Sequence, residues 1–331
     1  MSFEIDIAAN RTRSREEKGE SLKNIQPGRH LLIASTGGHL AQLVKWSSRI
    51  NSDEDSLWIT FDSAQSRSLL DGKRALLVPY IPPRSAIKSA VALRQIVRKV
   101  DWESENFVAA VSTGAALAVP GLYASRWHRI PSFYIESVSR VNGPSLSGKI
   151  VATDRRIDVS CQYENWADGR WSYRGTILDQ YERFSKASVA SPSIFVTLGT
   201  IKPYRFDSLI DAVLKTGLTD DRTIWQVGCT TREDLPGKVF PEMSSDAFDA
   251  AASAADIVVT HSGVGTILRL LDMGIYPVVV PRIQPRAEHV DNHQMQIASV
   301  VSQRKIGAVA NPDEIDPALL IESSGFYVKE I

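Results

Sequence analysis

Three glycine-containing turns place small and polar residues where a chain could bind a phosphate. The sequences are TGGH at 36–39, GT at 199–200 and SGVGT at 262–266, and each follows a short apolar run. Glycine lets a backbone approach a ligand or adopt positive φ, and the N–H groups that open a following helix attract anions. Three such turns indicate a substrate that contains a diphosphate. The candidate binding residues are Thr36, Gly37, Gly38, Gly199, Thr200, Ser262, Gly263, Gly265 and Thr266.

These turns differ from the common nucleotide-binding signatures. The first turn lacks the Gly-x-Gly-x-x-Gly pattern of dinucleotide-binding proteins, and Gly-Lys-Ser/Thr, typical of ATPases, occurs nowhere in the chain. Both a dehydrogenase and an ATPase are therefore disfavoured. The triplet Asp53-Glu54-Asp55 has the form of a metal–nucleotide motif, but it precedes a strand and so lies at the wrong end of the sheet. We interpret it as a solvated loop and expect no metal site.

The turns are positioned by apolar runs of strand length that alternate with segments of helix length. This alternation predicts parallel βαβ units in doubly wound sheets, which bind ligands beyond the carboxyl ends of their strands. The expected strands are 31–34, 57–61, 76–78, 108–111, 132–135 and 157–160, then 194–198, 223–227, 257–260 and 277–280. The expected helices are 40–50, 64–70, 85–100 and 115–127, then 206–214, 246–254 and 266–273.

The pattern divides the chain into two α/β domains. A polar stretch that ends in proline, 179–192, interrupts the alternation, which then restarts. With 331 residues the chain is long enough for two domains that each bury a core. We predict a mostly disordered lead-in over residues 1–28, a first Rossmann-like domain over 29–185 and a second over 186–331. The two doubly wound parallel-sheet domains are expected to face a cleft.

Composition disfavours several other classes of protein. The 38 lysines and arginines equal the 38 aspartates and glutamates, so no global positive charge favours nucleic acid. The two cysteines lie far apart, which suits a reducing cytoplasm and disfavours a disulfide scaffold. No apolar run approaches the roughly 18 residues of a membrane span, and the polar residues 9–24 lack the apolar core of a signal peptide. We therefore expect a cytoplasmic enzyme.

Longer segments resemble the MurG-like glycosyltransferases. Three of them resemble the acceptor half of these enzymes: LLIASTGGHLAQL (31–43), STGAALAVPGLYA (112–124) and FYIESVSRVNGPSLSGKIV (133–151). Three others resemble the donor half: IFVTLGTIKPYRFDSLIDAV (194–213), THSGVGTILRLLDMGIYPVVVPR (260–282) and EHVDNHQMQIA (288–298). The likeness is strongest to the paired subunits of bacterial exopolysaccharide glycosyltransferases and of the eukaryotic N-acetylglucosaminyl-dolichyl-diphosphate transferase, here fused in one chain.

The resemblance implies a GT-B fold and an inverting enzyme that moves a hexose-type sugar from a UDP-sugar to a polyprenyl-diphosphate-linked saccharide. Such enzymes act in cell-surface or exopolysaccharide biosynthesis and usually need no metal, so no cofactor is expected besides the donor substrate. His39 matches the family's glycine-glycine-histidine turn and is a candidate base, because a neutral imidazole can accept the proton of a hydroxyl. Its alternative role is to position the acceptor or to bind its phosphate. Glu136, at a strand end where the family has a glutamate, is the rival base. The implied acceptor-binding residues are Thr36, Gly37, Gly38, Thr113 and Gly114.

The donor half of the resemblance implies a second set of residues. Ser262, Gly263, Gly265 and Thr266 would hold the donor diphosphate, and Gly199 and Thr200 would close its other side. Asp291, Asn292, His293 and Gln294 fall where the family contacts the sugar hydroxyls, or alternatively form a polar helix start capped by Asp291. Arg269 departs from the family, because it stands where a glutamate usually accepts from the ribose, and arginine cannot accept a hydrogen bond. Asp272, one turn later, is the candidate substitute.

The segment 84–100 has the composition of a membrane-surface helix. RSAIKSAVALRQIVRKV contains five basic residues and an apolar set that can form one face. Such a helix either lies on anionic lipid or packs its apolar face on a sheet. Its position matches the membrane-docking region of the family, so we expect peripheral attachment to the inner face of the cell membrane. The expected lipid-contacting residues are Ile87, Val91, Arg94 and Arg98.

Two other functions stay open. A non-hydrolysing UDP-sugar epimerase shares the two-domain architecture, but it would need acid–base groups on both faces of the sugar and no lipid-binding surface. A catalytically silent scaffold of a transferase complex is the second, and Arg269 keeps it open. The sequence does not identify the donor sugar, the acceptor saccharide, the linkage or the oligomeric state.

Overall fold

The computed structural model describes residues 25–82, 85–199, 203–288 and 293–331. Thr200, Asp291, Asn292 and residues 1–24 of the predicted lead-in lie outside these ranges. The last residues of the lead-in are ordered, because Ile25 is buried and the N–H of Gly28 donates to the carbonyl oxygen of Asn51 at 3.2 Å. The folded part therefore begins before residue 29.

The chain forms two compact units, which comprise residues 1–177 (unit 1) and 178–331 (unit 2). The strands of unit 1 are β1 (His30–Ala34), β2 (Leu57–Phe61), β3 (Ala75–Val78), β4 (Ala109–Gly114), β5 (Ser132–Ile135), β6 (Ile157–Cys161) and β7 (Trp171–Tyr173). Its helices are α2 (Gly38–Arg49), α3 (Ala64–Leu69), α4 (Ala86–Lys99), α5 (Ala118–Trp127), α6 (Leu146–Val151) and the 3-10 helix η1 (Glu164–Trp166).

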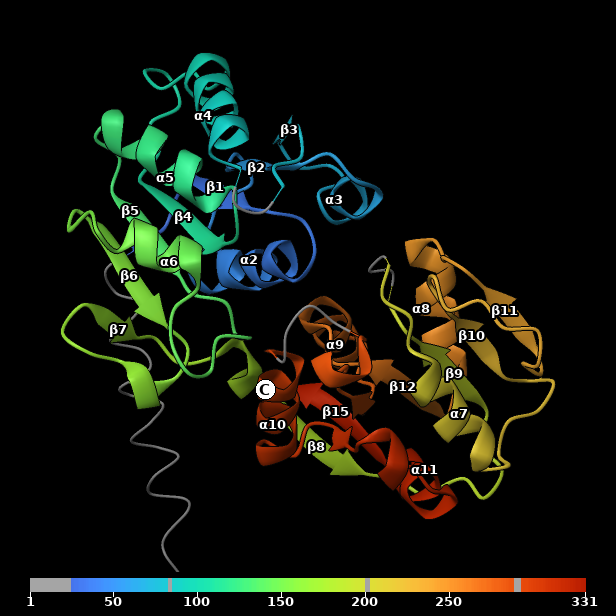
Figure 1. Ribbon diagram of the computed structural model, residues 1–331. Helices are drawn as coiled ribbons and strands as arrows, with labels where there is room; N and C mark the ends of the chain where they lie inside the picture. The colour runs from blue at the N-terminus through green and yellow to red at the C-terminus, as the bar shows by residue number, and fades with distance from the viewer. Residues whose placement is uncertain (1–24, 83–84, 200–202, 289–292) are drawn as a thin grey trace, which may run out of the picture. The chain divides into compact units, whose positions relative to one another are not determined.

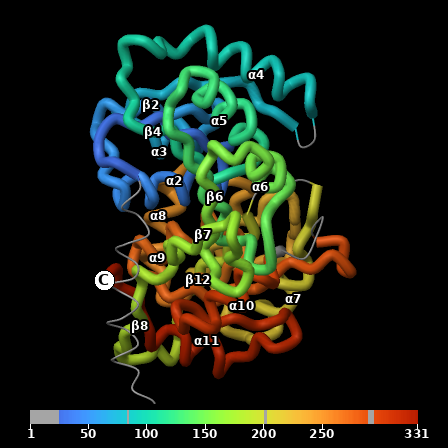
Figure 2. The backbone as a smooth tube through the Cα atoms, turned by 90° about the vertical axis from the view of Figure 1, so that its left-hand side faces the viewer, coloured from blue at the N-terminus to red at the C-terminus, as the bar shows by residue number. Residues whose placement is uncertain are grey.

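Unit 1 is built on one parallel sheet in the order β3-β2-β1-β4-β5-β6-β7 (Figure 1). The central strands β1 and β4 are buried along their whole length, which is why they read as continuous apolar or small-residue runs. Right-handed crossovers put α2 and α3 on one face and α4, α5 and α6 on the other. Figure 2 views the unit from the side of the second group. Both faces of the sheet are thus covered by helices.

Unit 2 repeats the design with a second parallel sheet in the order β11-β10-β9-β12-β13-β14. The strands of that sheet are β9 (Ile194–Thr197), β10 (Ile224–Gln226), β11 (Lys238–Phe240), β12 (Ile257–His261), β13 (Val278–Val280) and β14 (Ala308–Val309). Two further strands, β8 (Tyr181–Ser185) and β15 (Phe326–Glu330), form a separate pair. The helices of unit 2 are α7 (Asp207–Lys215), α8 (Ser245–Ala254), α9 (Val264–Asp272), α10 (His293–Gln303) and α11 (Pro317–Ser324). The 3-10 helices are η2 (Ile177–Gln180), η3 (Gln284–Arg286) and η4 (Pro312–Glu314).

Alternate side chains of β9 enter two apolar cores. Ile194 and Val196 pack with Leu209 and Val213 of α7, whereas Phe195 packs on the opposite face with Phe248 of α8. This alternation follows from the pleat of a strand, which points successive side chains to opposite faces. The core of unit 2 therefore lies on both sides of its sheet.

The boundary between the units lies earlier than the predicted residue 185. The cause is β8, which pairs antiparallel with β15, from Tyr181 opposite Glu330 to Ser185 opposite Phe326. A strand that pairs with the carboxyl-terminal end of the chain belongs to unit 2, although it lies within the polar stretch 179–192 that suggested a linker. This long-range pairing leaves no signal in the local sequence.

Both sheets have a topological switch point, where neighbouring strands lead to helices on opposite faces. It lies between β1 and β4 in unit 1 and between β9 and β12 in unit 2. Ligands of open parallel sheets bind outside the carboxyl ends of the strands at this point. All three predicted glycine turns follow one of these strands, so each unit presents its candidate residues at its own switch point.

Candidate active site

His39 lies in the first turn of α2 and is held by the end of β4. Its Nδ1 lies 2.8 Å from the carbonyl oxygen of Thr113, and the Thr113 hydroxyl donates to the His39 carbonyl oxygen at 2.7 Å. Gly114 has a φ of 114° and leaves room for the ring, because a Cβ there would lie 3.1 Å from Nδ1 of His39. The predicted acceptor residues Thr113 and Gly114 therefore hold the histidine.

The hydrogen bond to Thr113 determines which ring nitrogen of His39 is basic. A carbonyl oxygen can only accept, so Nδ1 carries the hydrogen of the neutral ring and Nε2 carries the lone pair. Nε2 has no hydrogen-bond partner within the described part of the chain. Burial lowers the pKa of His39, although the hydrogen bond to Thr113 and the charge of Glu136 oppose the shift. His39 is thus neutral near pH 7 and offers a basic nitrogen.

Glu136 follows β5, is fully buried and uses both carboxylate oxygens. Oε1 accepts from the N–H of Ser137 at 3.0 Å and from the hydroxyl of Tyr134 at 3.1 Å. Oε2 accepts from the N–H and the hydroxyl of Ser145 at 2.8 and 2.9 Å. Gly148 packs so closely that a Cβ there would lie 2.3 Å from Oε2. This geometry favours Glu136 as the anchor of the loop that leads into α6, rather than as a base.

Gln42, one turn after His39, ties α2 to the loop after β5. Its Nε2 donates to the hydroxyl of Ser137 at 3.0 Å, and its Oε1 accepts from the N–H of Val138 at 2.8 Å. Gln162 joins the same network, because its amide donates to Gln42 at 3.3 Å and to the carbonyl oxygen of Glu136 at 2.9 Å. These two glutamines were not among the predicted site residues. Their signal is a polar residue at a core-facing position, which must find buried partners.

The first glycine turn leaves the amino-terminal end of α2 open. Gly37 has a φ of 85° and precedes the helix, which Gly38 begins. The N–H of Gly37 donates to the side-chain oxygen of Gln65 at 2.6 Å, but no side chain caps α2. The first N–H groups of a helix have no partners inside it. The turn therefore has the geometry expected of an anion-binding turn, with the half-buried Thr36 beside it.

In unit 2, the ring of His261 lies against two of the predicted donor glycines. His261 ends β12, and a Cβ on Gly199 or Gly263 would lie 2.6 or 2.2 Å from the imidazole. Gly199 also has a φ of 72°. The imidazole therefore requires both glycines, which were predicted to allow the close approach of a ligand. His261 was not among the predicted site residues, and it forms the wall of the turn.

Ser262 presents a buried hydroxyl without a partner. The residue is 1% exposed, and its Oγ has no hydrogen-bond partner in the described residues. The next residue, Gly263, precedes α9 without a side-chain cap, so Gly265 and Thr266 lie in a turn with free N–H groups. Buried hydroxyls are normally hydrogen-bonded. An unpaired one beside an open helix start marks a position for the oxygens of an anion.

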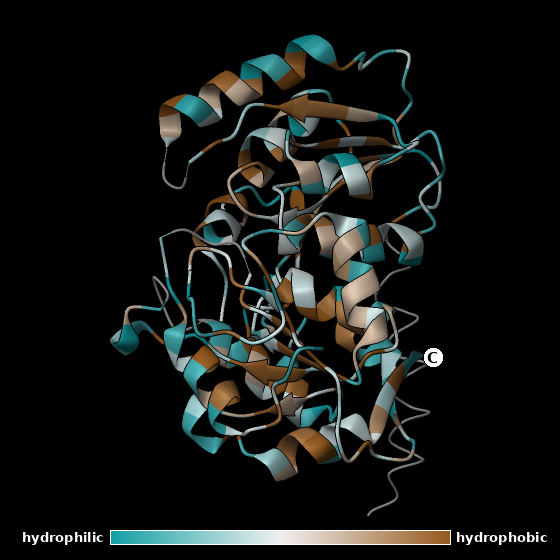
Figure 3. Ribbon diagram, turned by 90° about the vertical axis from the view of Figure 1, so that its right-hand side faces the viewer, coloured by the Kyte–Doolittle hydropathy of each residue, from teal (hydrophilic) through white to brown (hydrophobic). Residues whose placement is uncertain are grey.

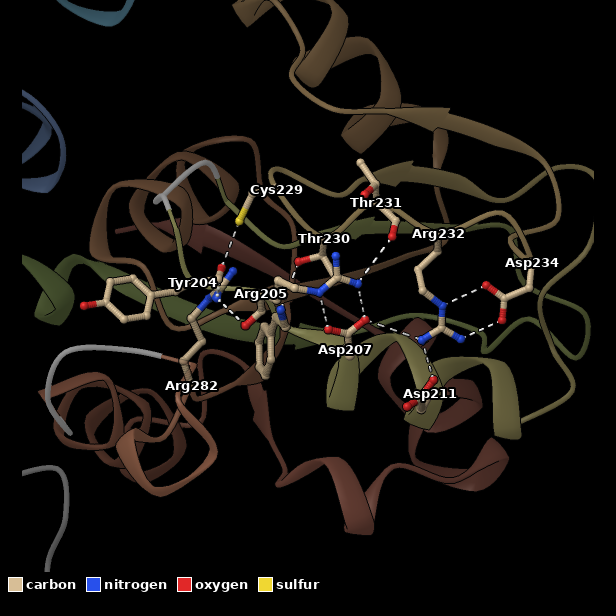
Figure 4. A network of polar contacts seen from close by, with 11 residues as sticks. Tyr204, Arg205, Asp207, Asp211, Cys229, Thr230, Thr231, Arg232, Asp234 and Arg282 are labelled. Carbon is tan, nitrogen blue, oxygen red and sulfur yellow. Dashed lines mark hydrogen bonds and ion pairs between the residues drawn. The ribbon is translucent and has the colours of Figure 1, made fainter.

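Arg282, two residues after the end of β13, connects the loops that border this turn (Figure 4). Its guanidinium is buried over the ring of Phe206, 4.6 Å from the ring centroid. Burial lowers the pKa of Arg282 to about 10. The carbonyl oxygens to which it donates, at 2.7–3.1 Å, belong to Leu198, Tyr204, Arg205 and Glu288. Arg282, which the sequence analysis did not single out, thus fixes the backbone before Gly199.

A cavity of about 440 Å³ lies at the start of α7 and has charged walls. Its two arginines are already paired: Arg205 donates to Asp207 at 2.7 Å, and Arg286 donates to Asp313 at 3.0 Å. Glu288, also in the wall, accepts from the N–H of Ile283 at 3.1 Å. The compensated charges do not favour an anion in this cavity.

Gln294 is buried and supports Arg282, because its Oε1 accepts from the backbone N–H of Arg282 at 3.1 Å. His293 is the first residue of α10, and its side chain lies outside the description. Gln294 thus has a structural contact where the resemblance implied a sugar contact. A role of its amide nitrogen toward a sugar stays a prediction.

The side chains of Arg269 and Asp272 both form hydrogen bonds with other residues of unit 2. Arg269 donates to Asp249 at 2.7 Å and to the carbonyl oxygen of Ser245 at 2.7 Å, so it joins α9 to α8. Asp272 accepts a hydrogen bond from the hydroxyl of Tyr181 on β8. The expected substitution of Asp272 for the family glutamate therefore lacks support, since its carboxylate connects α9 to β8.

The two interpretations of segment 84–100 apply to different sides of α4. Ala92 and Ile96 face the core, whereas Ile87 is 81% and Val91 is 58% exposed. Positions 87, 91, 94 and 98 follow helical spacing and form one exposed stripe. The helix at the top of Figure 3 shows apolar and polar residues side by side. The neighbouring helices α5 and α6 also expose the apolar residues Trp127, Leu146 and Ile150.

The described residues contain neither a candidate membrane span nor a candidate metal cluster. None of their helices is both long and apolar enough to cross a membrane. No group of three or more His, Cys, Asp or Glu side chains among them could hold a metal ion. The two aspartates of the triplet 53–55 are engaged locally, since Asp53 accepts from Ser56 at 3.1 Å and Asp55 pairs with Arg29 at 2.9 Å.

The chain resembles known proteins in the sequence of one domain and in its fold. Residues 194–321 match the family model of the glycosyltransferase family 28 C-terminal domain. The comparison with curated proteins found no match. The match covers the core of unit 2, including both of its glycine turns.

Solved structures match most of the chain at low identity. Acinetobacter baumannii MurG has a TM-score of 0.53 at 17% identity, over 89% of this chain and 93% of its own. Arabidopsis thaliana UGT89C1, solved with UDP-L-rhamnose, has a TM-score of 0.54 at 13% identity, over 90% and 89%. The UDP-GlcNAc 2-epimerase of Methanocaldococcus jannaschii has a TM-score of 0.53 at 10% identity, over 89% and 91%. The fold is therefore two parallel-sheet α/β domains of the kind found in GT-B glycosyltransferases, as predicted.

Proposed function

We propose that the protein is an inverting glycosyltransferase that moves a hexose-type sugar from a UDP-sugar to a polyprenyl-diphosphate-linked saccharide, in cell-surface or exopolysaccharide biosynthesis. The observation that carries the proposal is His39, whose Nδ1 is held by Thr113 and whose Nε2 has no partner among the described residues. The family 28 match over residues 194–321 supports a donor-binding role of unit 2. The acceptor class rests on the sequence resemblance of unit 1.

The proposed reaction needs one proton acceptor. Nε2 of His39 takes the proton of the acceptor hydroxyl while the hydroxyl oxygen attacks the anomeric carbon of the donor sugar. The bond from that carbon to the UDP oxygen breaks, and its electron pair leaves with UDP. Attack opposite the leaving group inverts the configuration. The low pKa of His39 keeps the imidazole neutral and ready to act near pH 7.

The departing diphosphate is stabilised by groups of unit 2. The free N–H groups of α9 and the hydroxyl of Ser262 would donate to its oxygens, and the helix adds a partial positive charge. Because these groups supply the needed stabilisation, we propose that transfer requires no divalent metal. EDTA should then leave both UDP binding and transfer intact. Loss of both on EDTA treatment, with recovery on adding a divalent cation, would contradict this part.

A single assay separates the proposed function from its alternatives. The protein is mixed with radiolabelled UDP-sugars and a short-chain polyprenyl-diphosphate saccharide, and lipid and nucleotide products are separated. Label in the lipid fraction supports the transferase. An epimerised UDP-sugar indicates the epimerase that the fold also accommodates, and no turnover indicates a scaffold.

The donor sugar can be identified by thermal shift. A ligand that binds the folded protein raises its melting temperature by an amount set by its concentration relative to Kd. UDP-glucose, UDP-galactose, UDP-glucuronate and UDP-N-acetylglucosamine form the panel, with UDP as reference. The donor should shift the melting temperature more than the other three sugars, and equal shifts for all four would mean that only UDP is recognised.

We further propose that the exposed stripe of α4 attaches the protein to the inner face of the cell membrane. Ile87 and Val91 would enter the apolar boundary, while Arg94 and Arg98 would lie near anionic headgroups. We expect a variant with glutamate in place of Arg94, Arg98 and Lys99 to lose binding to anionic vesicles and to keep its affinity for UDP. A matched variant with glutamate at the exposed Lys186, Lys215 and Lys238 of unit 2 should stay bound. Equal vesicle binding by both variants would contradict the surface-helix proposal.

A further inference from the structure

Arg140 has a fixed backbone, and its side chain lies near His39. Its N–H donates to the carbonyl oxygen of Ser137 at 2.9 Å, and its carbonyl oxygen accepts from the indole of Trp166 at 3.0 Å. Ser137 in turn accepts from Gln42 of α2, at 3.0 Å. The loop that carries Arg140 is thus tethered to the helix that carries His39. The guanidinium is near enough to interact electrostatically with both His39 and Tyr134.

The Arg140 side chain lacks the partner that comparable arginines of unit 1 have. Arg29, Arg74 and Arg174 bind aspartate or glutamate, and Arg170 donates to three carbonyl oxygens. Arg140 is half-buried, and no hydrogen bond or ion pair of its guanidinium occurs within the described ranges. The buried acid that begins this loop, Glu136, is occupied by four other donors. A partly desolvated charge without a counter-ion is costly, so a bound anion would complete this site.

We propose that Arg140 binds the diphosphate of the acceptor and thereby places the acceptor hydroxyl at Nε2 of His39. This inference rests on the proposed function, because it assumes a diphosphate-linked acceptor. Arginine suits the task, since its planar fork donates to two phosphate oxygens at once. The first turn of α2 lies in the same tethered assembly and adds a partial positive charge. The donor diphosphate is the less suitable ligand, because its proposed binding groups belong to unit 2.

The test compares two acceptors and three variants. One acceptor carries the saccharide on a short-chain polyprenyl diphosphate, and the other carries the same saccharide on an uncharged alkyl chain. Arg140→Gln should weaken binding of the diphosphate acceptor about 10- to 100-fold, which is the usual scale for losing hydrogen bonds to a charged group. Its Kd for the alkyl acceptor and for UDP should not change. Arg140→Lys should recover part of the loss, because lysine keeps the charge but not the fork.

Arg155→Gln is the matched control, because Arg155 is an exposed arginine of unit 1 that loses the same charge. It should bind both acceptors like the unmodified protein. Kd is measured directly and KM in parallel, so a protein that transfers no sugar still reports on Arg140. Absence of transfer by the unmodified protein would refute the proposed function alone.

Four results would overturn the assignment of Arg140. A parallel loss of UDP affinity would assign it to the donor diphosphate. A loss of anionic-vesicle binding with unchanged acceptor Kd would assign it to lipid headgroups. A lower melting temperature together with equal weakening of both acceptors would make it a structural residue. An unchanged Kd for the diphosphate acceptor would remove it from the site.

Discussion

The two units place a histidine at the same point of the same sheet topology, but from opposite strands. In unit 1, His39 follows β1 and is held from β4 by Thr113 and Gly114. In unit 2, His261 ends β12, which corresponds to β4, and packs on Gly199, which follows the β1-equivalent β9. Each imidazole thus has a glycine of the neighbouring strand end beside it.

The exposure of the two rings separates their roles. His39 is half-buried, with one nitrogen bonded and the other open. His261 is buried and fills the space that side chains on Gly199 and Gly263 would occupy. A histidine that starts the helix can reach a substrate, whereas one that ends the strand shapes the turn. Residue type and position in the sheet therefore do not determine function until the contacts of the ring are known.

The largest expected effect is the loss of catalysis on replacing His39. His39→Ala should lower kcat by about 10²- to 10⁴-fold, the usual scale for a general base. UDP affinity should stay the same, because the proposed donor groups lie in unit 2. His128→Ala is the control, since His128 is exposed and stacks on Trp102. If the loss appears mainly in the acceptor KM and turnover at saturation is kept, His39 positions the acceptor.

A stability effect should show that the His261 ring constrains its turn. Gly199→Ala should lower the free energy of unfolding by about 2–4 kcal/mol, through positive φ and overpacking against the ring. Gly217→Ala is the matched control: its φ of 68° is similar, but no atom lies within 4 Å of the added Cβ. That variant should lose only about 1–2 kcal/mol. Adding His261→Ala should restore the part of the stability that overpacking removes in Gly199→Ala, and should restore none in Gly217→Ala. Denaturant unfolding measures the free energy of unfolding of the two single and the two double variants. Equal costs at the two glycines would contradict this account.

Glu136→Gln should have the smallest effect, and it should be on stability. The four donors around Glu136 now bind two carboxylate oxygens, whereas an amide has only one acceptor oxygen. The free energy of unfolding should therefore fall by about 1–3 kcal/mol. Turnover at saturating acceptor should fall less than about tenfold, well below the loss of a general base. Glu164→Gln, at an exposed glutamate, is the control. Abolished turnover in a protein of unchanged stability would make Glu136 the base.

Much of the fold could be predicted because it depends on local patterns. Buried parallel strands such as 31–34 and 257–260 are short apolar runs, and the glycine turns after them mark the carboxyl edges of both sheets. The pairing of β8 with β15 could not be predicted, because it joins segments far apart in the sequence. The boundary between the units was therefore placed too late.

The candidate residues could be assigned to the ends of particular strands from the sequence, whereas their side-chain contacts could not. The sequence indicated His39, but its tautomer depends on the carbonyl oxygen of Thr113. It indicated Glu136, but the four donors that occupy this carboxylate come from three positions of the loop and strand around it. Arg282 was missed, because its partners are backbone carbonyl oxygens, which any residue supplies. Side-chain roles follow from three-dimensional neighbours, whereas periodicity reports only which face is buried.

The pH dependence of kcat/KM for the acceptor tests the central claim most directly. A histidine base must be neutral, so activity should rise with pH through the pKa of His39 and then level off. Burial places that pKa below the ordinary 6.5, and the acid limb should therefore have its midpoint below pH 6.5. Tyr134 remains protonated in this range, because burial raises its pKa well above 10. The residual activity of His39→Ala should lack the limb. A limb that persists unchanged in His39→Ala would contradict the account, because another group would then be the base.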